Sequence, residues 1–420
     1  MAVKFGGNGG FAVNKTQKNA VYKTQILRIN KNVAIFVVKK VCVMYIHQHQ
    51  QWPHFVWNKE AVAIKLAEVN KAAGYLEGRL SAIGFDAQMK AVVETVSHSV
   101  ICSSEIEGVQ LNSDQVRSSV ARKLGVPISG EVASSHYVDG VVEMMLDAMV
   151  HYDQPLTADR LFGWHCCLFP TGRSGYATVD VGEYRKGEMK VVSGMFGREK
   201  VHYVAPSAEN VEKEMNAFLA WFNGSTEVCD YVKSAVAHLW FVCIHPFDDG
   251  NGRIGRAIAD MALNMADRSK MRFFSMSRQI NAEKKKYYEV LEQTQNGDCD
   301  ITEWLVWYLS CMIRAISASD DALSRVLSKA TFWQVHAEKG ITERQRDVLN
   351  KYLDGYQGKL TVKKWAKFAA VSADTASRDV KDLVAKGILA PQEGRVRDVS
   401  YGVVISTGDI YVPGTTDDDE

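Results

Sequence analysis

The chain has 420 residues, and its 50 Lys and Arg against 49 Asp and Glu leave a formal net charge of +1. A nearly neutral total argues neither for nor against a nucleic-acid partner, and 46% hydrophobic with 24% charged residues is typical of an ordinary soluble globular protein. None of the eight cysteines forms a CxxC pair, which argues against a disulfide framework or a zinc site.

The first 43 residues differ from the rest of the chain in charge. Residues 1–43 contain eight Lys and Arg and no Asp or Glu, and we predict that this basic leader is disordered. Its apolar stretch Val33–Val38 is too short to cross a bilayer, which needs about 20 residues. Free thiols indicate a reducing compartment. We therefore expect a cytoplasmic protein with no membrane partner.

Residues 44–130 are predicted to form an N-terminal helical domain. Apolar residues recur at three- and four-residue spacing through Lys59–Leu80, which predicts an amphipathic helix. A second helix is predicted from about Ala87 to Glu107, followed by Gly108, a common residue after a helix C-terminus. His47 has no carboxylate or cysteine near it in the sequence, so we interpret it as a surface histidine rather than a metal ligand.

Residues 131–320 are predicted to form a second, mostly helical domain with one β-hairpin. Glycines bracket two β-prone runs, Met189–Val192 and Lys200–Val204, which is the pattern of a hairpin with a multi-residue loop. Helices are predicted to resume at Ala208–Phe222 and Val228–Ile244.

The segment from His245 to Arg256 carries the strongest functional pattern. The preceding helix must end near His245, because Pro246 disfavours helical geometry in the residue before it. Residues 248–252 combine turn-forming residues with two glycines, and a helix is predicted from Arg253. Free backbone N–H groups at the start of that helix would form an anion site. Arg253 and Arg256, about one turn apart, would face the same phosphate chain.

Two further side chains suit phosphoryl or nucleotidyl transfer. A carboxylate beside polyphosphate normally holds a divalent cation, usually Mg²⁺, and Asp249 is the better candidate with Asp248 as the alternative. His245 has a pKa suited to accepting a proton near neutral pH. Together these groups form a site in which positioning and charge stabilisation supply most of the catalysis.

These twelve residues resemble the Fic family motif HxFx(D/E)GNGRxxR at every fixed position. The resemblance implies transfer of AMP from ATP, with Mg²⁺, to a hydroxyl of a target protein. It also implies that His245 is the catalytic base and that Phe247 anchors the loop. The implied ATP- and phosphate-binding residues are Asp249, Gly250, Asn251, Gly252, Arg253, Gly255, Arg256 and, in the adenine pocket, Tyr288.

The resemblance extends to the hairpin. It matches the family's flap, which aligns the target segment by adding a strand through main-chain hydrogen bonds. The implied contacting edge is Val201, His202 and Tyr203.

Residues 103–108 resemble the family's inhibitory pattern (S/T)xxxE(G/N). Ser103, Glu107 and Gly108 would form this motif, with Glu107 paired to Arg256 so that Arg256 cannot reach the γ-phosphate. An ordinary helix end with exposed carboxylates is the alternative.

Residues 321–420 differ from the preceding domain because short predicted helices are followed by a strand-like segment, and they end in a short acidic tail. Two predicted helices, Lys359–Ala369 and Ala373–Lys386, are separated by three residues, and the strand-like Arg395–Ile405 follows. This is the pattern of a winged helix-turn-helix. DNA binding and protein contact both stay open, because acidic residues interrupt the basic stripe of the second helix. The residues predicted to face DNA are Ser372, Thr375 and Arg378.

The predicted fold is mainly α, with a Fic helical core, a β-hairpin flap and a C-terminal winged helix-turn-helix. The predicted function is an enzyme, a protein adenylyltransferase that acts on a Ser, Thr or Tyr hydroxyl and is held inactive by Glu107. The alternative is a DNA-binding transcriptional regulator whose Fic site binds nucleotide or modifies itself. A target protein is the expected partner, and the resemblance also implies a homodimer.

Overall fold

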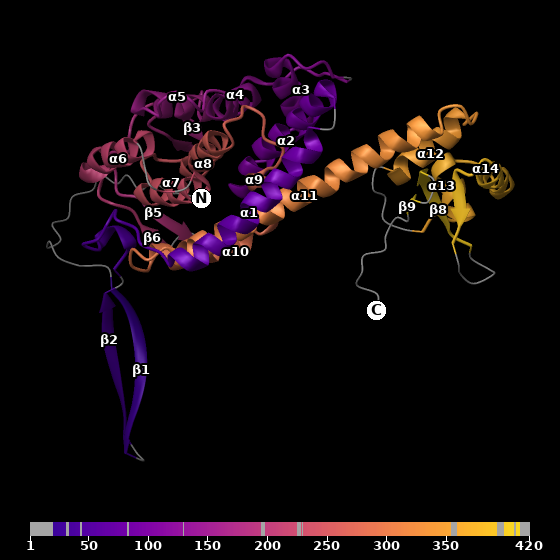
Figure 1. Cartoon of the computed structure of the whole chain (residues 1–420). Helices are drawn as coiled ribbons and strands as arrows, with labels where there is room; N and C mark the ends of the chain where they lie inside the picture. Colours follow the sequence, from indigo (N-terminus) through magenta and orange to yellow (C-terminus); the bar gives the residue numbers. More distant parts are fainter. Residues whose placement is uncertain are drawn as a thin grey trace. The chain divides into compact units, whose positions relative to one another are not determined.

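A computed structural model of the chain shows a mainly helical protein (Figure 1). It describes residues 20–30, 33–42, 44–81, 84–128, 130–194, 198–224, 228, 230–353, 359–392, 399–406 and 409–411. The chain divides into two compact units, Met1–Ser317 and Ala318–Glu420, which are considered separately below.

Helices make up most of the first unit. A short 3-10 helix, η1 (Ile46–Gln48), precedes ten α-helices within the described residues, and α11 (Thr302–Val335) continues from this unit into the second. The ten are α1 (Lys59–Leu80), α2 (Phe85–Ile106), α3 (Ser113–Leu124), α4 (His136–Val150), α5 (Ala158–Leu168), α6 (Ala208–Asn223), α7 (Asp230–Ile244), α8 (Asn251–Asp267), α9 (Met276–Ala282) and α10 (Lys284–Gln295).

The strands of this unit form three separate antiparallel pairs. These are β1 (Ala20–Asn30) with β2 (Val33–Cys42), β3 (Arg173–Ser174) with β4 (Ala177–Thr178), and β5 (Lys190–Ser193) with β6 (Lys200–Val204). The last pair is the predicted hairpin. Part of the basic leader therefore pairs as strands where we expected disorder, since β2 is rich in β-branched residues that favour extended backbone.

The helix pair α7 and α8 forms the centre of this unit. Figure 1 shows the two helices beside α4, α5 and α6, and these helices contact them. Gly255 permits close packing of the pair, because a Cβ there would lie only 3.0 Å from Val242 Cγ1. The loop that joins α7 to α8 is thereby held at a fixed place in the core. No helix among the described residues is both long and apolar enough to cross a membrane.

Within its described residues, the second unit contains the end of α11, three further helices and a three-stranded antiparallel sheet. The helices are α12 (Glu343–Leu353), α13 (Val362–Ala369) and α14 (Ala373–Ala385), and the strands are β7 (Leu389–Pro391), β8 (Tyr401–Ser406) and β9 (Asp409–Tyr411) in the order β7-β8-β9. A core that includes Leu349, Trp365, Val380 and Val403 joins helices to sheet. Arg395, part of the predicted strand-like segment, lies outside the described residues.

Candidate active site

The loop from α7 to α8 begins at His245, which has an unusual backbone conformation. Its φ is 52°, in the left-handed region that side chains other than glycine rarely adopt. The His245 N–H still donates to the Phe241 carbonyl (3.0 Å), so this residue closes the last turn of α7. The chain then turns sharply and carries the imidazole out of the helix beside the N-terminus of α8.

Two side chains fix the middle of the loop. Phe247 is fully buried and stacks on the ring of His165, with ring centroids 4.3 Å apart. The Asn251 amide binds the backbone of Phe247 twice: its Oδ1 accepts from the N–H (2.9 Å) and its Nδ2 donates to the carbonyl (2.7 Å). The predicted loop anchor is therefore in place, while the polar atoms of the Asn251 side chain shape the loop.

The two neighbouring aspartates have different environments. Asp248 is buried, and its carboxylate accepts from the Asp180 N–H (3.1 Å). Asp249 is half-buried; one of its oxygens accepts from the Gly250 N–H (2.7 Å) and the other from the Ser174 hydroxyl. Asp249 is thus the more accessible carboxylate. It lies at the start of α8, where a carboxylate could bind a divalent cation together with phosphate oxygens.

The first turn of α8 combines glycines with a buried arginine. Gly250 is the N-cap of the helix with φ 82°, so its backbone takes a turn that a side chain would strain. Arg253 is buried, donates through Nη1 to the Tyr137 hydroxyl (3.1 Å) and lies over the Phe169 ring. Its Nε is buried and has no hydrogen-bond partner among the described residues. Such a donor is of the kind that a bound anion would satisfy.

Arg256, on the next turn of α8, is held by the end of α2. Its Nε donates to the Ser103 hydroxyl (2.9 Å) and its Nη2 to the Ser103 carbonyl (2.8 Å). The same Nη2 lies 2.8 Å from Glu107 Oε1. The structure therefore brings Arg256 to Ser103 and Glu107, which lie far from it in the sequence. Gly108, the next residue of the predicted motif, has φ 78°.

Electrostatics favour the charged forms of this pair. Burial by itself raises the pKa of Glu107, but the adjacent Arg256 guanidinium outweighs burial and holds that pKa below its usual value. Burial likewise lowers the pKa of Arg256, and Glu107 outweighs it so that the pKa is raised. The two side chains form an ion pair beside the N-terminal end of α8, which is the positive end of the helix dipole.

The His245 imidazole is neutral at physiological pH. Burial lowers its pKa to about 4. Its Nδ1 lies 3.1 Å from the Val242 carbonyl, and since a carbonyl only accepts, Nδ1 carries the proton. Nε2 is left with a lone pair that can accept a proton from a bound hydroxyl.

Arg185 is a residue of this site that the sequence did not single out. It is 2% exposed and its guanidinium donates to the carbonyls of His245 (2.7 Å), Gly187 (2.7 Å) and Pro206 (2.5 Å). Its own N–H donates to the Pro246 carbonyl (2.9 Å). One buried side chain therefore joins the loop between α7 and α8 to both ends of the hairpin segment. Only its position in Gly182-Glu-Tyr-Arg185, just before the hairpin, could have marked it.

The predicted adenine-pocket residue Tyr288 and its neighbour Tyr287 differ in exposure. Tyr287 is buried and its hydroxyl lies 2.9 Å from His238 Nε2. Tyr288 is 41% exposed, and its hydroxyl donates to the Ile106 carbonyl at the end of α2 (3.2 Å). Tyr288 thus faces the region beside Glu107 and presents an aromatic ring there.

The predicted contacting edge of the flap is divided in the structure. Val201 is exposed, but the Tyr203 side chain is fully buried, and its hydroxyl donates to the Cys243 carbonyl of α7 (2.9 Å). His202 Nδ1 lies 2.8 Å from Glu292 of α10, and the His202 carbonyl accepts from Asn296 (3.1 Å). The hairpin is therefore fastened to α7 and α10, and of these three side chains Val201 alone points outward.

His47 also contacts this hairpin. Its Nδ1 lies 3.0 Å from the Tyr203 hydroxyl, and burial lowers its pKa to about 4. The interpretation of His47 as a surface residue is therefore wrong. The segment after η1 packs its aromatic residues, Trp52 and Phe55, against Trp240 of α7, and His47 is half-buried beside Trp52.

Two family models match this chain. Residues 45–126 match a domain of unknown function (DUF4172), and residues 155–263 match the Fic/DOC family. The second range includes the whole loop between α7 and α8 and the first turns of α8. This part of the chain is therefore similar to the Fic/DOC family.

Curated relatives cover the chain only in part. The protein adenylyltransferase Fic of Nematostella vectensis is 26% identical over 236 residues, which is 54% of this chain and 50% of that protein. A uridine 5'-monophosphate transferase of Xanthomonas campestris pv. campestris is 30% identical over 117 residues, 26% of this chain and 21% of that protein. The chain thus spans half or less of the length of these relatives. A solved structure of a Fic family protein from Desulfovibrio desulfuricans G20 is 20% identical with a TM-score of 0.48, covering 83% of this chain and 97% of that chain.

Proposed function

We propose that this chain is a protein adenylyltransferase that moves AMP from ATP to a hydroxyl of a target protein and is held inactive by Glu107. The observation that carries the proposal is the position of a neutral imidazole, His245, beside a glycine-rich helix N-terminus that also holds Arg253 and Arg256. A base next to a polyphosphate site suits attack of a hydroxyl on a phosphorus atom. The similarity to curated adenylyltransferases supports the choice of AMP.

In the proposed reaction, the target hydroxyl oxygen attacks the α-phosphorus of ATP. Its proton passes to His245 Nε2 as the new oxygen–phosphorus bond forms. The bond from the α-phosphorus to the bridging oxygen breaks, and pyrophosphate leaves with the electron pair. The N–H groups at the start of α8 and the Arg253 guanidinium stabilise the negative charge on the phosphate oxygens.

A divalent cation fits the donor set of this loop. Asp249 would hold Mg²⁺ together with phosphate oxygens, because Mg²⁺ in nucleotide sites takes one or two carboxylates and keeps water. The cation would neutralise phosphate charge during transfer. The half-buried Asp249 carboxylate is already oriented by Gly250 and Ser174.

Inhibition would act through the position of one carboxylate. Glu107 holds Arg256 away from the place where a γ-phosphate would bind, and its negative charge repels phosphate from the start of α8. Two contacts beyond the pair keep the end of α2 in place, from Asn281 to the Glu105 carboxylate (2.8 Å) and from Tyr288 to the Ile106 carbonyl (3.2 Å). ATP bound beside Glu107 would thus adopt an unproductive pose.

The test compares labelled-ATP transfer by wild type, Glu107→Gly and Glu107→Gly/His245→Ala in the presence of Mg²⁺ and a cell lysate. We expect label on protein only with Glu107→Gly, often first on the chain itself. The matched control is Glu94→Gly, which removes another carboxylate of α2 that pairs with Arg117 at the surface. It should leave transfer at the wild-type level.

The outcomes separate the parts of this proposal. No label in any lane, although ATP binds, would contradict adenylyl transfer. Equal label with wild type and Glu107→Gly would contradict inhibition but not transfer. A parallel reaction with labelled UTP tests the other donor suggested by the similarity to a uridine 5'-monophosphate transferase. A homodimer, implied by the family resemblance, is tested by sedimentation of the wild-type chain.

A further inference from the structure

The second unit has the arrangement of a helix-turn-helix followed by strands. Only the short segment 370–372 separates α13 from α14, and Ala370 takes the left-handed conformation (φ 52°) that makes the turn tight. Ser372 caps α14, since its hydroxyl oxygen accepts from the Thr375 N–H (3.3 Å). In such motifs the second helix enters the major groove of DNA and the first crosses the backbone. Whether this unit could also bind DNA depends on the charges on the exposed faces of α13 and α14.

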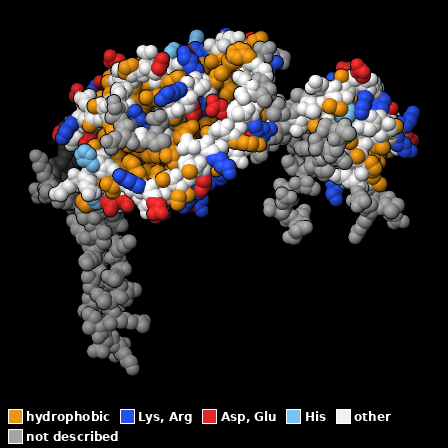
Figure 2. Space-filling model, in the orientation of Figure 1, with side chains coloured by type: hydrophobic (Ala, Val, Ile, Leu, Met, Phe, Trp, Pro, Cys, Tyr) orange, Lys and Arg blue, Asp and Glu red, His pale blue; other side chains and the backbone are white. Residues whose placement is uncertain are grey.

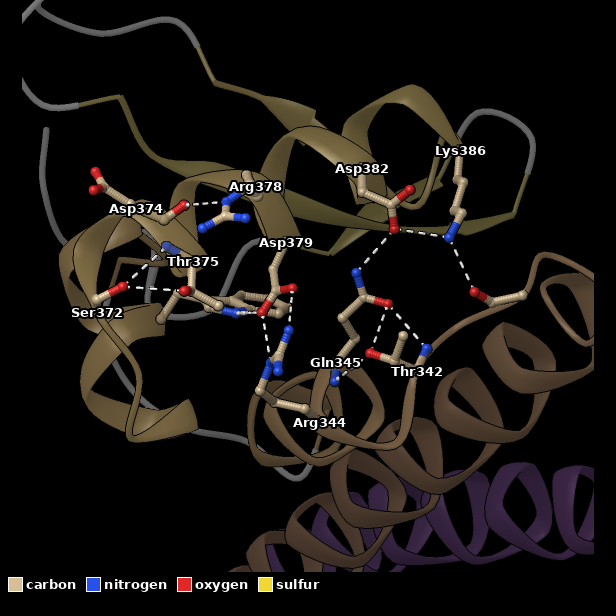
Figure 3. Close-up of polar contacts among 12 residues, drawn as sticks. Thr342, Arg344, Gln345, Ser372, Asp374, Thr375, Arg378, Asp379, Asp382 and Lys386 are labelled. Atoms are coloured by element: carbon tan, nitrogen blue, oxygen red, sulfur yellow. Dashed lines mark hydrogen bonds and ion pairs between the residues drawn. The ribbon is translucent and has the colours of Figure 1, made fainter.

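Two of the three acidic residues of α14 are bound by neighbouring side chains of this unit (Figure 3). Asp379 is buried and accepts from Arg344 through both oxygens, at 2.7 and 2.9 Å, and from the Trp365 indole (3.2 Å). Asp382 accepts from Gln345 (2.9 Å) and Lys386 (2.7 Å). These carboxylates hold α14 against α12 and α13. Asp379 therefore adds no negative charge to the surface, and the partly exposed Asp382 carboxylate is neutralised by its ion pair with Lys386.

The exposed face of α14 is positively charged. Arg378 and Lys381 are exposed and lie three residues apart. Asp374 is also exposed, and the Asp382 side chain, which pairs with Lys386, is 44% exposed. Arg378 Nε makes a long contact with the Asp374 carbonyl (3.4 Å), not with its carboxylate. Neither Arg378 nor Lys381 has an ion-pair partner among the described residues.

The helix α13 adds further positive charge next to this face. Lys363 and Lys367 are exposed one turn apart, and α13 contains no acidic residue. Within the described part of the chain, neither lysine forms an ion pair. In the space-filling view, Lys and Arg side chains are visible on the surface of this unit near α14 (Figure 2). Four cations without an ion pair among the described residues therefore lie on the exposed faces of two adjacent helices, together with the exposed Asp374 and the Asp382 carboxylate that pairs with Lys386.

We propose that this basic face, formed by Lys363, Lys367, Arg378 and Lys381, binds double-stranded DNA, with α14 in the major groove. The cations would neutralise phosphates, while Ser372, Thr375 and Arg378 at the start of α14 lie where side chains contact base edges. A protein partner is disfavoured because the face is charged and largely without exposed aromatic anchors, which dominate protein interfaces. The proposal goes beyond the adenylyl-transfer site, which lies in the other unit.

The experiment measures fluorescence anisotropy of a labelled 30-base-pair duplex of random sequence, with the full-length chain added at several salt concentrations, without ATP. Non-specific duplex binding has a Kd of about 1–100 μM at physiological salt, so we expect binding in or below this range at about 50 mM salt. With four phosphate contacts, log Kobs should fall against log salt with a slope of about −3 to −4. Lys381→Ala should reduce the steepness of this slope by about one.

Charge reversal assigns the binding to this face. Lys381→Glu should weaken duplex binding at least about tenfold, whereas Lys71→Glu, a matched reversal of an exposed lysine on α1, should have little effect. Because Lys381 is exposed, both of its variants should keep the wild-type melting curve. A single-stranded oligonucleotide of the same length should bind more weakly than the duplex, since a groove is required.

Four outcomes would overturn the proposal. They are no duplex binding at about 50 mM salt, unchanged binding by Lys381→Glu, an equal loss with Lys71→Glu, and tighter binding of the single strand. A change of oligomeric state with Lys381→Glu, without duplex binding, would instead identify this face as a protein interface.

Discussion

The carboxylate of Glu107 occupies the space in which a side chain at Gly252 would lie. A Cβ built at Gly252 would be 2.1 Å from Glu107 Oε1 and 3.2 Å from Arg256 Nη1. The glycine at this position therefore allows the ion pair between Glu107 and Arg256 to form directly against the backbone of α8. In the proposed function, phosphate oxygens of ATP and the Glu107 carboxylate would compete for the space beside Gly252.

Gly252→Ala should affect stability differently in two backgrounds. In wild type, the new methyl group must displace the Glu107 carboxylate from Arg256, and we expect a loss of about 1–3 kcal/mol in the free energy of unfolding. In Glu107→Gly the clash is gone, and alanine in a helix is up to about 1 kcal/mol better than glycine. The substitution should then be neutral or stabilising. Urea denaturation of the four proteins measures this coupling.

Gly163→Ala is the matched control for this cycle. A Cβ at Gly163, within α5, would meet nothing within 4 Å. It should change stability equally with and without Glu107. If Gly252→Ala also changes the free energy of unfolding equally with and without Glu107, then Glu107 does not lie against Gly252 in solution.

Arg185→Met should reduce both stability and transfer. The substitution leaves three buried carbonyls without their donor, which we expect to cost about 2–4 kcal/mol, and it releases the backbone of His245. Misplacement of a catalytic group by about 1 Å can cost about a hundredfold in rate. The rate of AMP transfer by folded protein is measured in the Glu107→Gly background.

Arg272→Met provides the comparison for Arg185. Arg272 is also buried, but it pairs with Asp260 of α8, not with the catalytic loop. Its loss should destabilise the chain and leave the rate per folded molecule nearly unchanged. Equal rates for the two variants would contradict a positioning role for Arg185.

Stability should fall as the pH is lowered from about 6.5 towards 4. Burial lowers the pKa of His47, His165, His238 and His245 to about 4, whereas an unfolded histidine titrates near 6.5. Between these values the unfolded state binds more protons, so each such group lowers the free energy of unfolding by up to about 1.4 kcal/mol per pH unit on acidification. Urea denaturation at several pH values gives the slope.

His47→Gln removes one of these groups and should flatten the slope between pH 4 and 6.5 by up to about 1.4 kcal/mol per pH unit. His98→Gln is the control, because His98 bonds only to the Glu94 carbonyl of its own helix, at the surface. An unchanged slope with His47→Gln would show that His47 is not buried in solution.

Glu292→Gln should loosen the flap without unfolding the chain. The carboxylate pairs with Lys200 (3.0 Å) and His202 (2.8 Å) of β6, and such partly exposed pairs contribute less than about 1 kcal/mol. We expect faster hydrogen exchange in β5 and β6 with little change in melting temperature. Glu289→Gln on the same helix removes a carboxylate that does not contact the flap, and it should leave exchange in the hairpin unchanged.

Local patterns in the sequence accounted for much of the fold. Helix α1 has the predicted bounds, α2 begins two residues earlier than predicted, and the hairpin strands lie within or close to their predicted runs. These elements are specified by short-range signals such as apolar periodicity, glycine and β-branched residues. The loop of residues 245–252 was recognisable for the same reason.

Contacts between residues far apart in the sequence could not be predicted from such local patterns. Arg185 acts through carbonyls, which are present in every residue and leave no pattern in the sequence. The inward orientation of Asp379 depends on Arg344 from another helix, so the charge of α14 could not be judged from its own residues. His47 is half-buried because Tyr203, which is distant in the sequence, packs against it.

The left-handed backbone of His245 sets the proposed catalysis against stability. A residue that follows a helix in this conformation is usually glycine, and most other residues there cost about 1–2 kcal/mol. Replacement by glycine would relieve that strain and remove the proton acceptor at the same time. Selection for stability alone would therefore favour glycine at position 245, which would give an inactive protein. Only selection for the proposed activity would retain the histidine.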